Sequence, residues 1–415
     1  MSGQPSGLAP CGLRHVPMTA PFAPITAAAG ERAVYVVFWR EGRPAGGLVL
    51  LAGELPVPAA AVPALAAAAV GRSVAIMTPE PEKETEGASE DDAGRSGSLP
   101  TVSVVVCTRD RAQDLNRCLV SLSRCVPAPA EIVVVDNAPT NGTTEAVVRL
   151  HSGVRYVREP RAGLSHARNT GVRTAAGSII AFTDDDVEVS TDWIVRLAAP
   201  FADPEVACVT GIVLPADLSG EAACLFEFTV GAFGKEFAPK RYERTFLDRE
   251  WWRAPDVWRV GAGASMAIRR QAFAEVGLFD PRLGAGASGC SEDSEFWFRL
   301  LQAGRVCIYD PAAVVFHHHR PDLTGLSRQL RAYTRGHVVA LFVQFAQDRR
   351  PCHLVRVFGI MPWHFLKTTV RALRQRDRAR LAVVVPQFRG WFESPIHALR
   401  WLRRDGPPRL SGDIS

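Results

Sequence analysis

Three consecutive aspartates follow a short apolar run near the middle of the chain. The run SIIAFT, residues 178–183, leads directly into Asp184, Asp185 and Asp186. Carboxylates placed together in a folded protein cost free energy unless a cation compensates their charge. Alternate residues of an extended segment point the same way, so we expect Asp184 and Asp186 to bind one divalent metal, Mg²⁺ or Mn²⁺, while Asp185 turns away. A solvated acidic loop is the alternative.

Polar residues also follow two other apolar runs. TVSVVVCT, residues 101–108, is followed by RDR, and EIVVVDN, residues 131–137, ends in an acid and an amide. Ligands of open parallel sheets bind outside the carboxyl ends of the strands, where such loops meet. The sequence therefore predicts an anionic pocket at that edge, in which a metal could bridge the two phosphates of a nucleoside diphosphate.

These runs belong to a regular alternation of strand and helix patterns. Short β-branched runs suit buried parallel strands, and apolar residues spaced three or four apart suit helices. Strands are predicted at residues 101–108, 131–137, 154–159 and 178–186, with helices at 110–125, 143–151 and 164–175 between them. Four alternations of this kind predict an α/β domain with a mostly parallel sheet and right-handed crossovers.

Shifts in composition divide the 415-residue chain into four regions. The first is expected to be a small domain with a poorly ordered start over residues 1–30, a β-hairpin within 34–55 and a helix near 59–70. The second is rich in Glu, Asp, Gly and Ser and predicts a flexible acidic linker. The third holds the alternating pattern, and the fourth is expected to be helical and basic. The four regions are 1–77, 78–98, 99–320 and 321–415.

Basic residues are concentrated in the C-terminal region. From Arg320 to Ser415 there are 18 Lys and Arg against six Asp and Glu, so this region carries +12 and the rest of the chain −7. Apolar residues at helical spacing between Met361 and Leu373 stand beside an Arg-rich segment, which is typical of an amphipathic helix on an anionic membrane surface. A helical subdomain packed on the core with a solvated basic face is the alternative. No motif specifies nucleic acid, so none is expected as a partner.

The cysteines and the hydropathy pattern suggest a location. The nine cysteines include no C-x-x-C pair, and we expect them to be buried and reduced, as in a reducing cytosol. No apolar stretch approaches the roughly 20 residues of a spanning helix, and no secretory signal is recognisable. We expect a cytoplasmic protein, at most peripheral on the inner face of the cell membrane. The use of 44 Arg against four Lys indicates a bacterium with a GC-rich genome.

Six motifs in one order carry a resemblance to a known family. They are SVVVCTRDR, EIVVVDN, GLSHARNTG, IIAFTDDD, GAGASMAIRR and SEDSEFWFRL; they run from residue 103 to residue 300, within a similar stretch from residue 101 to about 319. This stretch resembles family 2 glycosyltransferases with the GT-A fold. The resemblance implies a metal-dependent enzyme that moves a sugar from a nucleotide-sugar donor to an acceptor hydroxyl with inversion. It leaves the acceptor open among a glycan, a lipid-linked sugar and a small natural product.

The same resemblance implies roles for individual residues. It implies that Asp293, beside Glu292, is the base that removes the acceptor proton. The alternative for these two acids is that they only satisfy a helix start capped by Ser291. It further implies donor contacts from Thr108, Asp110, Asp136, Arg168, Asn169, Asp184 and Asp185, a metal bound by Asp184, Asp186 and His317, and an acceptor side with Gly263 and Ala264. Apart from the resemblance, the segment EWWRAPDVW offers Trp251, Trp252 and Trp258 as candidates to stack on a sugar face, and Trp252 is assigned to the acceptor side. A core or loop cluster is the alternative for Trp252.

Two departures and two rival functions remain. Cys107 stands where the family often has Pro, and Asn137-Ala138-Pro139 replaces the usual acidic turn, which leaves the donor nucleotide open. A nucleotidyltransferase would share the nucleotide-binding sheet but would need a Gly-rich loop after the first strand, and TRDR has no glycine. A catalytically inactive nucleotide-binding scaffold is the second alternative, and the intact acids argue against it.

Overall fold

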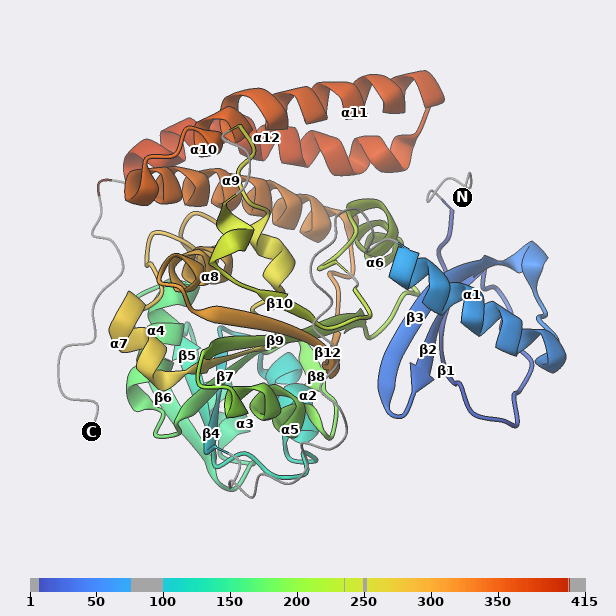
Figure 1. Ribbon diagram of the computed structural model, residues 1–415, viewed down its shortest axis with the longest axis horizontal. Coiled ribbons are helices and arrows are strands. Elements are labelled where there is room, and N and C mark those ends of the chain that lie inside the picture. The colour runs from blue at the N-terminus through green and yellow to red at the C-terminus, as the bar shows by residue number, and fades with distance from the viewer. Residues whose placement is uncertain (1–6, 76–99, 235, 249–251, 402, 404–415) are drawn as a thin grey trace.

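The computed structural model describes residues 7–75, 100–234, 236–248, 252–401 and 403. The expected linker over residues 78–98 lies outside the described residues. A small sheet with one helix comes first in the chain, a large sheet with helices on its faces follows, and long C-terminal helices cover one side of it (Figure 1).

The N-terminal unit is a three-stranded sheet. Its elements are β1 (Cys11–Pro17), β2 (Ala33–Arg40), β3 (Arg43–Leu51) and α1 (Val62–Ala75). The hairpin expected within residues 34–55 is formed by β2 and β3. Strand β1 pairs in parallel with β2, which corrects the expectation of a poorly ordered start for residues 11–17. The physical reason is that β2 is buried on both faces: Val34, Val36 and Phe38 pack toward α1, while Tyr35 and Val37 join the core of the large sheet.

The first half of the large sheet has the parallel architecture that the sequence predicts. Strand β4 pairs in parallel with β5 on one side and with β7 on the other, and β5 pairs in parallel with β6. This confirms the α/β fold class. The elements are β4 (Val102–Thr108), α2 (Ala112–Leu122), β5 (Glu131–Asn137), α3 (Thr143–Val148), β6 (Val154–Glu159), α4 (Leu164–Thr174) and β7 (Ile179–Asp184).

The second half of the sheet mixes directions. Strand β11 runs antiparallel between β7 and β9, and β12 runs parallel to β9. Short strands β8 and β10 pair with β12. The strands are β8 (Val187–Val189), β9 (Val206–Pro215), β10 (Lys240–Tyr242), β11 (Met266–Arg269) and β12 (Val306–His317). The helices of this half are α5 (Trp193–Ala198), α6 (Glu221–Leu225), α7 (Arg270–Val276) and α8 (Glu292–Gln302). This arrangement brings the end of β12 and the segment before β11 beside the end of β7.

The C-terminal region is helical, as expected. Its elements are α9 (Leu323–Asp348), α10 (Cys352–Val355), α11 (Met361–Gln375) and α12 (Arg378–Trp401). Figure 1 shows α9 on the side of these helices nearer to the large sheet, with α11 and α12 farther out. Helix α9 is anchored to the core, because Gln347 donates a hydrogen bond of 2.8 Å to Glu295 on α8 and Val339 packs on Leu283. None of the helices in the described part of the chain is long and apolar enough to cross a membrane.

Candidate active site

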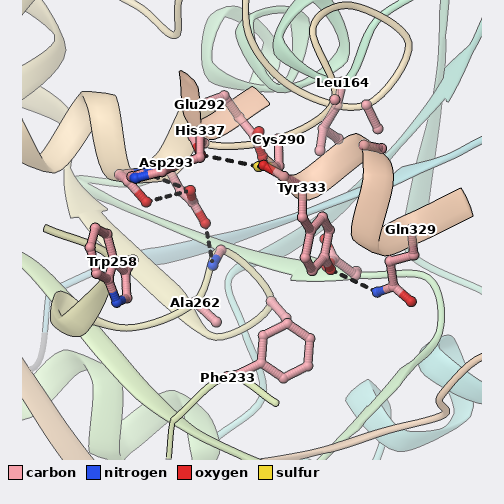
Figure 2. A pocket seen from close by; sticks show the side chains of 18 of the residues that line it. Leu164, Phe233, Trp258, Ala262, Cys290, Glu292, Asp293, Gln329, Tyr333 and His337 are labelled. Carbon is pink, nitrogen blue, oxygen red and sulfur yellow. Dashed lines mark hydrogen bonds between the residues drawn. The ribbon is translucent and has the colours of Figure 1, made fainter. Parts of the chain in front are cut away.

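A cavity of about 1390 Å³ opens at the carboxyl ends of β4 and β7 and reaches to the C-terminal helices. Figure 2 shows part of its wall, with Asp293 and Glu292 facing Tyr333 and Gln329 of α9. Most of the residues expected to form the site line this one cavity. They are Thr108, Arg168, Asp184, Asp185, Asp186, Gly263, Ala264, Glu292, Asp293 and His317.

The three aspartates form an acidic cluster, in which Asp185 and Asp186 both contact Arg111. The Nη1 atom of Arg111 donates hydrogen bonds of 2.9 Å to Asp185 and 2.8 Å to Asp186. Thr108 donates a further hydrogen bond of 2.7 Å to Asp185. Asp185 therefore does not turn away from Asp186, which corrects the sequence-based expectation. Burial, reinforced by the charge of Asp186, raises the pKa of Asp185 to about 7, so additional positive charge would stabilise its ionised form.

The end of β12 places an imidazole nitrogen beside these acids. The Nε2 atom of His317 lies 3.4 Å from the Oδ1 atom of Asp186, a separation that two ligands of one ion can have. Among the described residues no group of three or more His, Cys, Asp or Glu side chains converges as a complete metal site. Mg²⁺ and similar ions are commonly held by one or two protein carboxylates together with substrate phosphates. The Asp186 carboxylate and the His317 imidazole fit such an ion, whose remaining ligands would come from substrate phosphates and water.

A hydrogen-bonded chain orients His317. Its Nδ1 atom lies 2.9 Å from Nδ1 of His319, whose Nε2 atom lies 3.1 Å from a carboxylate oxygen of Glu227 in the π-helical segment Phe226–Val230. With both rings neutral, His319 donates to Glu227 and accepts from His317. The Nε2 atom of His317 then keeps its lone pair toward Asp186, as a metal ligand requires. Burial, with His319 adding to it, lowers the pKa of His317 to about 3 and keeps this ring neutral.

Arg168 joins the acidic cluster to the second pair of acids. It lies on α4, is buried, and its Nη1 atom donates a hydrogen bond of 2.7 Å to Glu292. Its Nη2 atom lies 3.6 Å from Asp184. One guanidinium therefore contacts both groups of carboxylates. The acids at the end of β7 and those at the start of α8 lie on the same side of the sheet.

Asp293 is held by two backbone amides while it faces the cavity. Its Oδ2 atom accepts a hydrogen bond of 3.0 Å from the backbone N–H of Gly263, and its Oδ1 atom accepts one of 2.6 Å from that of Ser294. Ser291 occupies the position before α8 but makes no capping hydrogen bond, which corrects the expectation that it caps this helix. Its hydroxyl contacts the Sγ atom of Cys290 instead.

Glu292 differs from Asp293 because it is buried against Arg168. Burial raises its pKa to about 7, although the charge of Arg168 opposes this and the charge of Asp293 adds to it. Glu292 thus has its side chain committed to an ion pair inside the protein, whereas Asp293 is partly exposed in the cavity. Of the two acids, Asp293 is the better placed to accept a proton from a bound molecule.

Four of the expected site residues do not line the cavity. Asp110 is exposed and accepts a hydrogen bond of 3.0 Å from the backbone of Thr140. Asp136 is fully buried and accepts a hydrogen bond of 2.9 Å from Tyr156. Of the tryptophans considered for stacking, Trp252 is exposed outside the cavity and Trp258 lines it. Trp251 lies outside the described residues.

Asn169, the fourth, does not face the donor site as the resemblance implied. Its side-chain amide donates a hydrogen bond of 2.8 Å to the carbonyl of Phe279 and accepts one of 2.9 Å from the same residue's N–H. The Phe279 ring lies 5.5 Å from the guanidinium carbon of Arg168. Asn169 therefore fixes the position of Phe279, whose ring packs against Arg168. Both the N–H and the oxygen of its side-chain amide are used in these two hydrogen bonds.

Three contributors to the cavity were not expected to act at the site. Arg111 was visible in TRDR, but nothing in that sequence shows which way its side chain points. Arg320 lies 3.6 Å from Asp186 and follows the three histidines directly. Tyr333, on α9, forms part of the far wall, and no local pattern links that helix to the sheet.

Comparisons with known proteins place the same part of the chain in a family. Residues 103–277 match the family model described as Glycosyl transferase family 2. The pre-mycofactocin glycosyltransferase of Mycobacterium tuberculosis is 27% identical over 269 residues, which cover 63% of this chain and 52% of that protein. The glycosyltransferase AglE of Haloferax volcanii is 25% identical over 274 residues, which cover 65% of this chain and 81% of that protein. The chain thus spans about half the length of the first of these relatives.

A solved structure shows the same fold. A mannosyltransferase from Pyrobaculum calidifontis, in complex with GDP-Man and Mn²⁺, superposes with a TM-score of 0.51 at 18% sequence identity. The match covers 72% of this chain and 87% of that chain. At this level of identity the likeness concerns the fold.

Proposed function

We propose that this chain, whose residues 103–277 match glycosyl transferase family 2 and whose sheet has the GT-A fold, moves a sugar from a nucleoside-diphosphate-sugar donor to an acceptor hydroxyl. One observation carries the proposal. The acids after β7 and the Asp293 carboxylate face a single cavity, with Arg168 between them. A donor that spans this cavity would have its diphosphate at the first group and its sugar toward the second.

The end of β7 and the end of β12 would hold the metal. Asp186 and His317 offer two ligands, with Asp184 beside them. A divalent ion bound there would neutralise the charge that develops on the leaving diphosphate. We infer Mn²⁺ or Mg²⁺, because the donor atoms are oxygen and imidazole nitrogen; the mannosyltransferase of the same fold was solved with GDP-Man and Mn²⁺.

In this structure, two arginines compensate the charge of the acids. Arg111 and Arg320 both contact Asp186. If Asp186 held a metal, it would no longer need the charge of these arginines, and both guanidinium groups would be available to the phosphates of the donor. Guanidinium groups suit phosphate because their planar donors match its oxygens. Thr108 and Asp185, bonded to each other, would keep the acidic loop fixed during this exchange.

Asp293 would act as the base. The amides of Gly263 and Ser294 orient its carboxylate, which keeps it ready to take the acceptor proton as the hydroxyl attacks the sugar. Displacement in one step, with the base and the leaving diphosphate on opposite sides of the sugar, inverts the anomeric centre. Gly263 and Ala264 would border the sugar and the acceptor, and Trp258 takes the place proposed for Trp252 on that side.

The acceptor side is the part of the cavity under the C-terminal helices. Its wall combines polar and apolar side chains, which suits a molecule with hydroxyl groups and an apolar part. These side chains are Gln329, Tyr333, His337, Met361, His364 and Phe365.

The nine cysteines are all free thiols, and eight of them are buried. This supports a reducing compartment, and we propose the cytoplasm of a bacterium.

A donor screen tests the proposal. The full chain is incubated with UDP-, GDP- and dTDP-sugars and Mn²⁺, and release of the nucleoside diphosphate is followed together with donor binding by calorimetry. We expect binding and slow release with one nucleotide class, both lost when the metal is chelated. If no donor binds with either metal, the proposed function is wrong. The nucleotidyltransferase alternative predicts release of pyrophosphate from nucleoside triphosphates instead.

A further inference from the structure

Helix α11 carries an apolar stripe on the side that faces solvent. Residues three or four apart in a helix share one face, and four large apolar side chains of α11 follow this spacing. They are between 37% and 66% exposed. The buried residues Phe365 and Ala372 lie on the opposite side of the helix. The stripe consists of Trp363, Leu366, Val370 and Leu373.

Helix α12 carries a second stripe of the same kind. Its members also follow helical spacing and are between 41% and 75% exposed. The two helices lie next to each other, and Phe365 of α11 contacts Phe388 of the second stripe with ring centroids 6.2 Å apart. Single exposed apolar residues are normal in proteins, but two aligned rows on neighbouring helices are not. The second stripe consists of Val385, Phe388, Phe392, Ile396 and Leu399.

Basic side chains flank the stripe of α11. Each lies one residue beyond a member of the stripe, so the row that they form lies along its edge. Residues 361–401 contain eight Lys and Arg against two Asp and Glu, a net charge of +6. Both acids are paired inside this region or with α9, Asp377 with Arg380 and Glu393 with Arg331. The row beside the α11 stripe consists of Lys367, Arg371 and Arg374.

We propose that the outer faces of α11 and α12 bind the surface of an anionic lipid bilayer. Helices with one apolar side and flanking cations lie in the interface, with apolar side chains among the acyl chains and cations at the lipid phosphates. Figure 1 shows these helices in the outermost layer, on the far side of α9 from the sheet. A second copy of the chain is a poorer occupant, because the same basic rows would face each other.

The position of the active-site cavity agrees with this orientation. Met361, His364 and Phe365 of α11 and Gln387 of α12 line the cavity on the inner side of the same helices. A chain bound through α11 and α12 would therefore hold its cavity next to the bilayer. The binding surface itself is separate from Asp293 and the acidic cluster, so membrane binding does not depend on sugar transfer.

Vesicle flotation with the full chain tests the proposal. Vesicles of phosphatidylcholine mixed with phosphatidylglycerol are compared with vesicles of phosphatidylcholine alone. We expect the chain to float with the anionic vesicles, to bind neutral vesicles far more weakly, and to be released by high salt. The Arg371→Gln, Arg374→Gln double variant should bind anionic vesicles about 30-fold more weakly, since each cation near such a surface contributes a factor of about five.

Substitutions in the stripes separate insertion from simple charge attraction. Phe392→Glu with Ile396→Glu should abolish flotation, whereas Leu150→Glu, at a side chain that is 78% exposed on the catalytic domain, should leave it unchanged. Because all three side chains are exposed, the variants should keep the wild-type melting temperature. The proposal is overturned if the wild type does not float, or if the stripe variant floats as well as Leu150→Glu. It is also overturned if the chain is a dimer in solution that the stripe variant splits.

Discussion

Replacing Gly263 by Ala should damage catalysis far more than folding. A Cβ atom at this position would lie 2.6 Å from Nη2 of Arg168 and 3.0 Å from Oδ2 of Asp293. Both distances are well below an ordinary contact, so these two side-chain ends must move. The backbone of Gly263 has no positive φ and accepts Ala. The substitution therefore displaces the proposed base and its neighbouring cation without a large change in the fold.

The size of the effect follows from the required movement. Ordinary contacts of a Cβ atom begin near 3.4 Å, so the Asp293 and Arg168 groups must retreat by roughly 0.4 and 0.8 Å. A misplacement of about 1 Å in an active site can cost about 100-fold in rate. We expect kcat to fall by about 10- to 100-fold, which corresponds to about 1.4–2.7 kcal/mol in the activation free energy.

The assay is nucleoside diphosphate release at saturating donor, with donor affinity and melting temperature measured in parallel. Gly142→Ala is the matched control, because a Cβ atom there meets nothing within 4 Å. It should match the wild type in all three measurements. If Gly263→Ala folds normally and retains the wild-type kcat, the position of Asp293 does not limit the reaction and the reasoning fails.

Three further predictions concern the metal side of the cavity. Asp186→Ala should lose Mn²⁺-dependent donor binding in calorimetry while the melting temperature stays near that of the wild type; full retention of binding would place the metal elsewhere. Glu227→Gln should weaken Mn²⁺ binding, measured by electron paramagnetic resonance without turnover, because His319 would no longer be held in the tautomer that leaves Nε2 of His317 free; unchanged affinity would exclude this positioning role. Because the pKa of Asp185 is raised to about 7, this acid is protonated below that pH, and Mn²⁺-dependent donor binding should weaken by up to about tenfold for each pH unit below it. A flat binding profile across that range would contradict the assignment.

The core of the site could be predicted because it depends on local patterns. Each strand of the parallel half is a short β-branched run, and the ends of such strands meet at one edge of the sheet. The acids after β7 reach the cavity for this reason, whereas the pair at the start of α8 was identified through its family motif. Their family motifs are contiguous in sequence, so no long-range information was needed to find them.

Other residues could not be placed from the sequence because their side-chain directions depend on the fold. Asp110 has φ of 54°, and this left-handed turn directs it to Thr140 while Arg111 reaches back to the acids. Asp136 lies near the end of β5 as expected. However, its carboxylate accepts a hydrogen bond from Tyr156 of the neighbouring strand and does not line the cavity. Neither effect has a signature in the residues around these positions.

Contacts between segments that are distant in the sequence could not be predicted either. Strand β1 is recognisable only through its partner β2, because a parallel pair has no hairpin turn that would mark it. The far wall of the cavity comes from α9, more than 100 residues beyond the acids of β7. Which of the tryptophans near residue 255 enters the cavity depends on that packing, since Trp258 contacts His337 of α9 and Trp252 does not line the cavity.

The central claim is that Asp293 takes the acceptor proton while a separate group of acids holds the donor. The most direct test measures Mn²⁺-dependent donor binding and nucleoside diphosphate release for Asp293→Asn, with the exposed Asp217→Asn as the control. The account predicts that Asp293→Asn binds the donor like the wild type and releases almost no product, while Asp217→Asn behaves normally in both assays. Product release by Asp293→Asn at the wild-type rate would contradict it.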